Sequence, residues 1–215
     1  MTSQSIIQTF TAQAEAVSTR VFQVSDVSQA LGQVVEACVH KEACTLLASG
    51  CEEDLSPQAA DLCALKEWSK VMALPGLDPK IVEPLIPDCR EKGIRIIQRG
   101  LRGHLGGIDI GVTWAEQGIA DTGTVVIDSS REDLRLAGMI SEIHAVLLPA
   151  AAIFPDLAAL SAPLQASFQN APNYTSFITG ASRTADIERV LTLGVHGPLE
   201  VHIYIVEDAS HADSK

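Results

Sequence analysis

Residues 124–149, TVVIDSSREDLRLAGMISEIHAVLLP, decide the fold. Two short apolar runs, residues 125–128 and 144–148, are rich in aliphatic residues and predict two buried strands. Residues 131–138 between them predict a helix, and Pro149 ends the second strand because proline has no backbone N–H. A strand, a helix and a second strand in this order are typical of a parallel sheet that is covered by helices.

The same alternation continues on both sides of this unit. Asp26 with Gln29, and Ser56 with Pro57, are helix-start signals, since a side-chain oxygen at the N-cap binds free amides and proline suits the first turn. We therefore expect an α/β fold with a mostly parallel sheet and helices on both faces. The expected helices are about residues 5–20, 27–41, 56–69, 109–119, 155–168 and 184–191, with a short one after Asp78-Pro79; the expected strands are residues 21–24, 45–48, 93–97, 174–179 and 201–206.

The length of 215 residues is enough for one domain with a full core. We expect a helical N-terminal extension over residues 1–25, the main α/β domain over residues 26–207 and a flexible polar tail over residues 208–215. No stretch approaches the roughly 20 apolar residues of a membrane span, and the N-terminus lacks the basic start of a signal peptide. Cytoplasmic localisation is the resulting expectation.

The composition narrows the class of partner. Hydrophobic residues make up 47% of the chain and aromatic residues only 4%, so the core has to be built from aliphatic side chains, as in a parallel sheet. The formal charge is −12. A field of that sign repels phosphate backbones and anionic lipids, which argues against nucleic acid and membrane partners.

The chain has five cysteines, at positions 38, 44, 51, 63 and 89, and no two are spaced as CxxC. Structural zinc sites and ferredoxin-type clusters need closely spaced thiolates, and this spacing is missing. The histidines form no H-x-x-x-H or H-E-x-x-H pair either. We therefore expect reduced, buried thiols and no metal bound by this chain; a regulatory thiol among Cys38, Cys44 and Cys51 is the alternative.

Residues 90–111, REKGIRIIQRGLRGHLGGIDIG, contain more basic than acidic residues, although the chain as a whole is acidic. Glycines let backbone amides approach an anion, and arginine presents a planar fork to carboxylates and phosphates, so Arg102 is a candidate ligand-binding residue. The alternative is a surface loop whose arginines pair with the surplus acids. A Walker motif and a G-x-G-x-x-G motif are both absent, so nucleotide binding by those routes has no support.

A turn of small polar residues, Asp121-Thr122-Gly123-Thr124, feeds the strand at residues 125–128. Hydroxyls on both sides of a glycine can bind an anionic ligand or a carbonyl oxygen, which makes Thr122, Gly123 and Thr124 ligand-binding candidates. Glu116 and Asp121 are the candidate acid–base residues. An ordinary helix–strand turn is the alternative reading.

A third candidate, residues 180–188, lies between an expected strand and an expected helix. Free amides at a helix start favour anions, so Ser182, Arg183 and Thr184 are ligand-binding candidates. Acidic residues that merely stabilise the first helical turn are the alternative. His196 is added because the glycines on either side of Val195-His196 can fix the position of its side chain.

Several of these stretches together resemble the lactate-utilization protein C family, whose members are built on a LUD domain. The matching stretches are GVTWAEQGIADTGTVVI at residues 111–127, IHAVLLP at 143–149, TGASRTADIE at 179–188 and LGVHGPLEVHIYIVED at 193–208. They follow one another in consistent order. The first 85 residues carry little recognisable signal.

The resemblance implies a three-layer α/β/α fold similar to that of sugar-phosphate isomerases and CoA transferases. It implies a subunit of a system that oxidises L-lactate to pyruvate, with iron–sulfur clusters on partner subunits. The candidate residues near the expected strand ends predict that this chain binds a small carboxylate or phosphorylated ligand between Arg183, the Thr122-Gly123-Thr124 turn and the glycine-rich loop. The missing cluster-type cysteines agree with the C component rather than the B component. Two alternatives stay open: a stand-alone isomerase-like or CoA-transferase-like enzyme, and a non-catalytic assembly subunit of an iron–sulfur oxidoreductase complex.

Overall fold

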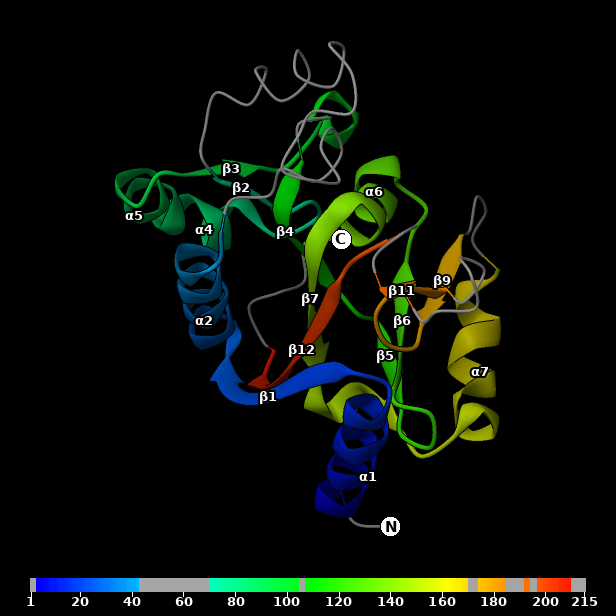
Figure 1. Cartoon of the computed structure of the whole chain (residues 1–215). Coiled ribbons are helices and arrows are strands. Elements are labelled where there is room, and N and C mark those ends of the chain that lie inside the picture. The colour runs from blue at the N-terminus through cyan, green and yellow to red at the C-terminus, as the bar shows by residue number, and fades with distance from the viewer. Residues whose placement is uncertain are drawn as a thin grey trace.

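The computed structural model describes residues 3–42, 70–104, 107–169, 174–184, 192–193 and 197–209. Its centre is a sheet of six strands in the order β1-β12-β7-β4-β2-β3, with every neighbouring pair parallel. The sheet runs obliquely through the molecule in Figure 1. Its strands are β1 (Thr19–Asp26), β2 (Lys70–Ala73), β3 (Ile94–Ile97), β4 (Ile108–Trp114), β7 (Ser141–Pro149) and β12 (Glu200–Asp208).

One face of this sheet is covered by helices α2, α4 and α5 (Figure 1). The start of α2 is set by Asp26, whose Oδ1 accepts from the Gln29 amide at 2.9 Å, while the Gln29 side chain accepts from the Ser25 amide at 2.7 Å. Asp78 caps α4 in the same way through the Lys80 amide. The bounds are α2 (Val27–His40), α4 (Pro79–Val82), a 3-10 turn η1 (Glu83–Leu85) and α5 (Ile86–Glu91).

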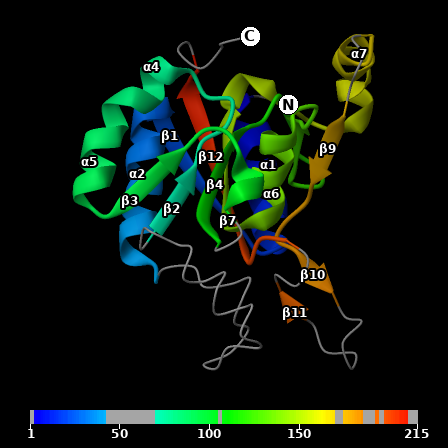
Figure 2. The same cartoon turned by 90° about the horizontal axis from the view of Figure 1, so that it is seen from above.

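The opposite face is covered by helices α1 and α6 and by a second sheet (Figure 2). Helix α6 approaches β4 closely because Gly111 has no side chain: a Cβ there would lie 2.2 Å from the Ala137 carbonyl oxygen. Phe10 and Ala14 of α1 are fully buried against β7 and β12. The bounds are α1 (Ser3–Ala16), a 3-10 turn η2 (Leu101–Gly103) and α6 (Glu132–Ile140).

The second sheet has four strands in the order β8-β5-β6-β9, of which β5–β6 and β6–β9 are antiparallel. Helix α7 packs on its outer face through Leu160, which contacts Ile119 and Val126. The bounds are β5 (Gln117–Ile119), β6 (Thr124–Asp128), a 3-10 turn η3 (Ala150–Ala152), β8 (Ile153–Phe154), α7 (Leu157–Ser167), β9 (Thr175–Ile178) and a separate pair, β10 (Arg183–Thr184) with β11 (Thr192–Leu193).

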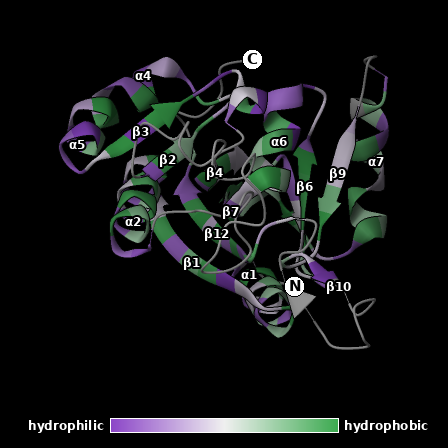
Figure 3. Ribbon diagram, turned by 45° about the horizontal axis from the view of Figure 1, so that its top comes forward, coloured by the Kyte–Doolittle hydropathy of each residue, from purple (hydrophilic) through white to green (hydrophobic). Residues whose placement is uncertain are grey.

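The distribution of hydrophobic residues explains this layering. Strands β4, β7 and β12 are buried along almost their whole length, as parallel strands between two covered faces must be. Helices α2 and α5 mix hydrophobic and hydrophilic residues (Figure 3), with the hydrophobic residues of α2 turned to the sheet. Aliphatic side chains dominate the core, as the low aromatic content predicted.

The predicted α/β class with a mostly parallel sheet and flanking helices is confirmed. Most expected elements are present near their predicted bounds, including the unit from β6 through α6 to β7. Strand β1 begins at Thr19, inside the residues 1–25 that we expected as a helical extension, and it pairs with β12 from Thr19 to Asp26. The expected strand at 45–48 and helix at 56–69 lie outside the described residues.

The expected helix over residues 109–119 is wrong. These residues form β4 and β5. Residues 108–114, IDIGVTW, alternate apolar residues with Asp109, Gly111 and Thr113, which is the period of a strand, and the helix prediction overlooked this alternation. Thr184 begins no helix either: it lies in β10, paired with Thr192, and residues 185–191 lie outside the described part.

Candidate functional site

A cavity of about 370 Å³ lies between α6 and β9, on the face of the main sheet that carries the second sheet. Its volume is in the usual range of small-molecule sites. The apolar part of its wall includes Leu134, Met139, Phe177 and Val201. The polar part comes from Ser129, Arg135, His144, Tyr174, Thr175, Ser176 and Ser182. We call this cavity the α6–β9 pocket.

Arg135 gives the α6–β9 pocket a positive charge. Its Nη1 donates to the carbonyl oxygens of Ser129 and Ser130 at 2.6 and 3.0 Å, and its guanidinium carbon lies 5.4 Å from the centre of the Tyr174 ring. These contacts hold the guanidinium at the end of β6 and use few of its five N–H groups. No carboxylate among the described residues lines the pocket, so this charge is available to an anionic ligand.

Two hydroxyls lie beside the arginine. Ser129 Oγ donates to Ser176 Oγ at 2.8 Å, which links the end of β6 to β9. The far wall is held by the Ser182 amide, which donates to the Pro198 carbonyl at 3.1 Å. Hydroxyl groups both donate and accept, so they suit a ligand with carboxylate or hydroxyl oxygens.

His144, on β7, also borders the pocket. It is only 1% exposed, and its Nε2 lies 2.8 Å from Thr113 Oγ1 on β4. Its Nδ1 is buried and has no hydrogen-bond partner among the residues that the structure describes. Burial lowers the pKa of His144 to about 4, so the imidazole is neutral near pH 7.

The Asp121–Thr124 turn lies outside the pocket, against the end of α1. Gly123 is buried with φ +63°, and a Cβ there would lie 2.3 Å from the Ala14 amide nitrogen. The Thr124 hydroxyl bonds those of Thr122 and Thr179 at 2.8 and 2.7 Å. The structure therefore gives Gly123 and Thr124 contacts with the scaffold; a ligand-binding role for the turn stays a prediction.

The other sequence-predicted residues are dispersed. Glu116 is half-buried, Asp121 and Arg183 are exposed, and Arg102 pairs with Glu132 on the surface. Among the predicted site residues within the described ranges, Ser182 alone lines the α6–β9 pocket. His196 lies outside the described residues, although its neighbours Gly197 and Pro198 reach the pocket wall.

Sequence reasoning missed the polar residues that do meet in the pocket. Arg135 is a single cation within an amphipathic helix, and Ser129 and Ser176 are common surface residue types, so none of them forms a motif. His144 was visible only as a histidine within an apolar strand. The pocket is assembled from α6, β6, β7 and β9, and contacts between elements so far apart have no signature in local spacing.

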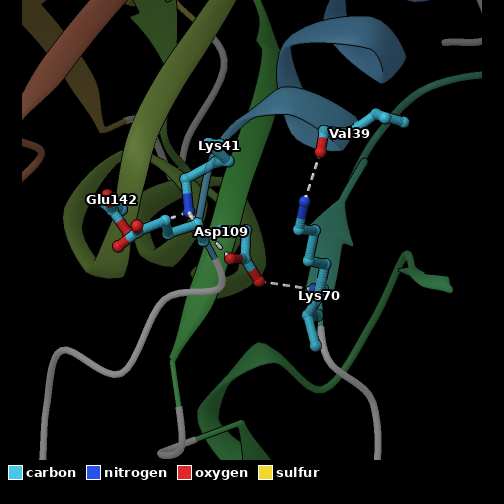
Figure 4. Close-up of polar contacts among 7 residues, drawn as sticks. Val39, Lys41, Lys70, Asp109 and Glu142 are labelled. Atoms are coloured by element: carbon cyan, nitrogen blue, oxygen red, sulfur yellow. Dashed lines mark hydrogen bonds and ion pairs between the residues drawn. The ribbon is translucent and has the colours of Figure 1, made fainter.

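A second polar cluster lies at the amino ends of β2, β4 and β7 (Figure 4). Lys41 Nζ lies 2.9 Å from Asp109 Oδ1 and 3.1 Å from Glu142 Oε2, and Asp109 Oδ2 accepts from the Val71 amide at 2.6 Å. Burial alone would lower the pKa of Lys41, but hydrogen bonds and charge from Asp109 and Glu142 outweigh it and raise the pKa. Because Lys41 bonds both carboxylates and joins the end of α2 to β4 and β7, the cluster has the character of a structural crosslink.

The carboxyl edge of the main sheet, where open α/β sheets commonly bind ligands, is acidic here. A wider hollow at that edge is lined by Asp26, Asp78 and Asp208, with Lys80 as the one cation among the described lining residues. Three carboxylates disfavour an anionic ligand. No group of three or more histidine, cysteine or acidic side chains within the described ranges is placed to hold a metal ion.

The layered architecture and the cationic pocket are those of an α/β protein with a small-molecule binding site. Comparison with known sequences identifies the family. A sequence model of the LUD domain matches residues 7–206, so the chain belongs to the LUD domain family. The resemblance to the lactate-utilization protein C family is thereby confirmed.

The chain is similar to three curated proteins over about 100 residues each. It is 34% identical over 103 residues to lactate utilization protein C of Bacillus licheniformis and 32% identical over 103 residues to that of Bacillus subtilis. It is 35% identical over 102 residues to the uncharacterized protein YkgG of Escherichia coli. Each alignment covers 46% of this chain and 43% or 44% of the relative, which is less than half of either.

A solved structure supports the fold over nearly the whole chain. The crystal structure of a DUF162 family protein from Deinococcus radiodurans superposes with a TM-score of 0.56 and covers 96% of this chain and 99% of that one. The sequence identity is 14%, so the likeness concerns the fold alone. No helix among the described residues is long and apolar enough to cross a membrane.

Proposed function

We propose that this protein takes part in lactate utilization and binds a small organic carboxylate in the α6–β9 pocket. The observation that carries the proposal is Arg135, a fixed cation in a pocket that no carboxylate of the described residues lines. Acids outnumber bases 27 to 15 in the chain, yet all the described residues that line this pocket lack a carboxylate. The names of the similar proteins support the lactate part of the proposal.

The proposed role in catalysis is that of a subunit. We propose that iron–sulfur clusters on partner subunits carry the electrons of the oxidation of L-lactate to pyruvate, and that this chain holds no cofactor itself. Burial raises the pKa of Cys38 to about 12 and that of Cys89 to about 11, which keeps both thiols protonated near neutral pH. Protonated, buried thiols support the reading of these two cysteines as core residues.

A stand-alone isomerase-like or transferase-like activity would require an acid–base residue beside the ligand. Glu116 and Asp121 are outside the lining of the α6–β9 pocket, so this pocket gives that alternative no specific support. The proposed site accordingly binds and orients a carboxylate, and the electron chemistry belongs to the partners.

The proposal is tested by binding and by growth. Isothermal titration of the purified chain with L-lactate and pyruvate is compared for wild type, Arg135→Gln and Arg131→Gln. Loss of a charge-assisted contact predicts about 10- to 100-fold weaker binding for Arg135→Gln. Arg131→Gln is the matched control, because it removes the same charge beside the same helix but lies outside the pocket.

In a strain that lacks this gene, Arg135→Gln should fail to restore growth on lactate while Arg131→Gln restores it. Wild-type affinity in Arg135→Gln, or no binding of either acid to wild type, would contradict the proposed function.

A further inference from the structure

The hydrogen bonds open to Thr113 and His144 favour one tautomer of the His144 imidazole. The Thr113 hydroxyl has a single hydrogen-bond partner among the described residues, His144 Nε2 at 2.8 Å. If Thr113 donates to Nε2, the threonine hydrogen is satisfied and one group is left over, an N–H at Nδ1. If Nε2 donates instead, both the threonine hydrogen and the Nδ1 lone pair are left without partners. Buried polar groups without partners are costly, so the first arrangement is favoured.

Nδ1 is therefore a buried donor beside the α6–β9 pocket. Gly138 of α6 faces the ring: a Cβ at position 138 would lie 3.1 Å from His144 Cε1 and 3.5 Å from Nδ1. Both Gly138 and His144 line the pocket. Glycine inside a helix costs stability relative to alanine, so this position gives up helix stability and leaves room beside the imidazole.

The imidazole faces Gly138, which lies within one turn of Arg135 on α6. Positions 135 and 138 are three apart on α6, so they share one helix face and are separated by about 4.5 Å along the helix axis. A ligand of a few carbon atoms can span that separation. It can place a carboxylate at the guanidinium and a second oxygen at the imidazole.

We propose that His144 is a specificity-determining residue whose Nδ1–H donates to an oxygen on C2 of the bound carboxylic acid. The pocket then selects 2-hydroxy and 2-oxo acids over acids that lack an oxygen at C2. The inference rests on the proposed function, since it assigns the second contact of the same ligand. Thr113 is a positioning residue that holds the imidazole in the donating tautomer.

A histidine with a purely structural role would be expected to have different hydrogen bonds and neighbours from those of His144. A core imidazole placed only for packing has no reason to keep one nitrogen unpartnered at the edge of a polar pocket. Leu134, Met139 and Val201 line the same pocket, and an apolar side chain at position 144 would carry no unpartnered nitrogen. The unpartnered nitrogen, the glycine facing it and the arginine one turn away are explained together by a ligand.

The test uses the full chain and ligands that differ by one oxygen. Pyruvate, L-lactate and acetate are titrated into wild type, His144→Asn and His144→Gln. Asparagine places its amide nitrogen at the δ position and so keeps a donor near Nδ1. Glutamine places its amide at the ε position, where it can bond Thr113 but offers no donor at δ. The tautomer of His144 in wild type is read separately from the ¹⁵N shifts of its two ring nitrogens.

The expected result is an Nδ1–H tautomer and about tenfold or stronger preference for pyruvate and L-lactate over acetate in wild type. His144→Asn should keep most of this preference, and His144→Gln should bind all three acids about equally. The preference is a ratio within one variant, so partial unfolding of a variant does not change it.

Two results would overturn the inference while the proposed function stands. One is an Nε2–H tautomer, and the other is an unchanged preference in His144→Gln, each with binding that still depends on Arg135. If wild type binds none of the three acids, the proposed function fails and the inference fails with it.

Discussion

At the scale of single residues, some charged side chains are paired with opposite charges, and Arg135 lies in a pocket where it can bind an anion instead. Lys41 pairs with both Asp109 and Glu142 in a largely buried cluster, whereas Arg135 has carbonyl and aromatic contacts but faces a pocket without described carboxylates. The first arrangement stabilises the sheet, and the second is suited to a ligand. Whether a charged side chain has a partner of opposite charge therefore distinguishes a structural site from a ligand site better than the residue type does.

The buried cluster predicts a large stability effect at Asp109. Asp109→Asn removes a fully buried carboxylate that accepts from Lys41 and from the Val71 amide, and it leaves the lysine with a single acidic partner. Breaking a buried ion pair typically costs about 3 kcal/mol or more. Urea unfolding should show this loss, while Arg102→Gln, which breaks an exposed pair with Glu132, should leave the midpoint unchanged. Equal midpoints for wild type and Asp109→Asn would show that the cluster is not a crosslink.

His144 predicts a pH dependence of folding stability. Its pKa falls from 6.5 to about 4 on burial, so the unfolded chain binds more protons than the folded chain between these two values. Stability is thus fully present above pH 6.5 and is lost as the pH falls towards 4, by about 3 kcal/mol. Urea unfolding at pH 7 and at pH 4.5 should show a smaller pH effect in His144→Asn than in wild type. The same effect in both proteins would mean that His144 titrates normally.

The site residues were hard to predict because their chemistry comes from their surroundings. Ser182, which was predicted to bind a ligand, lines the α6–β9 pocket, and its ligand-binding role stays a prediction. Arg135 and Ser129 gain their proposed role from a contact between α6 and the end of β6. Gly123 was prominent in the sequence, and the structure explains this by the approach of α1 to the turn.

At the scale of elements, α6 organises the pocket. It contacts β4 through Gly111 and the η2 turn through Asp133, whose carboxylate accepts from the amides of Gly100 and Leu101. These contacts fix the helix against the main sheet while Arg135 and Gly138 line the pocket. The glycine-rich loop that we expected to bind a ligand thus contributes backbone amides to hold α6.

The close approach of α6 predicts opposite effects for two glycines. Gly111→Ala would place a Cβ 2.2 Å from the Ala137 carbonyl oxygen, so the helix must shift, at a typical cost of about 1–3 kcal/mol. Gly32→Ala, at an exposed position of α2, meets nothing within 4 Å and should stabilise by about 0.5–1 kcal/mol. Thermal unfolding of both variants compares them directly. A neutral Gly111→Ala would contradict the packing of α6 on β4.

The sequence predicted the positions of helices and strands better than it predicted which strands pair with one another. The strand–helix–strand unit from residue 124 to 149 exists, but β6 belongs to the second sheet and pairs antiparallel with β5 and β9. Alternation of strands and helices suggests a parallel sheet without saying which strands join it. The buried strand β4 was mistaken for a helix although IDIGVTW at residues 108–114 alternates with the two-residue period of a strand.

At the scale of the whole molecule, the two candidate ligand regions lie at different places on the main sheet. One is at its carboxyl edge, and the other is on the face that carries the second sheet. The carboxyl edge is acidic, with Asp26, Asp78 and Asp208, and the α6–β9 pocket is cationic through Arg135. A small anion entering a chain of charge −12 should therefore concentrate at the α6–β9 pocket. The family match over residues 7–206 spans the elements that build both regions, so the family alone does not choose between them.

The most direct test of the central claim is to locate the bound ligand by NMR. Pyruvate is titrated into ¹⁵N-labelled wild-type protein, and backbone amide shifts are followed. Binding in the α6–β9 pocket predicts the largest shifts at the pocket residues Ser129, Gly138, Ser176 and Ser182, and their loss in Arg135→Gln. Shifts centred on Asp121–Thr124, or on the acidic edge at Asp26 and Asp78, would contradict it.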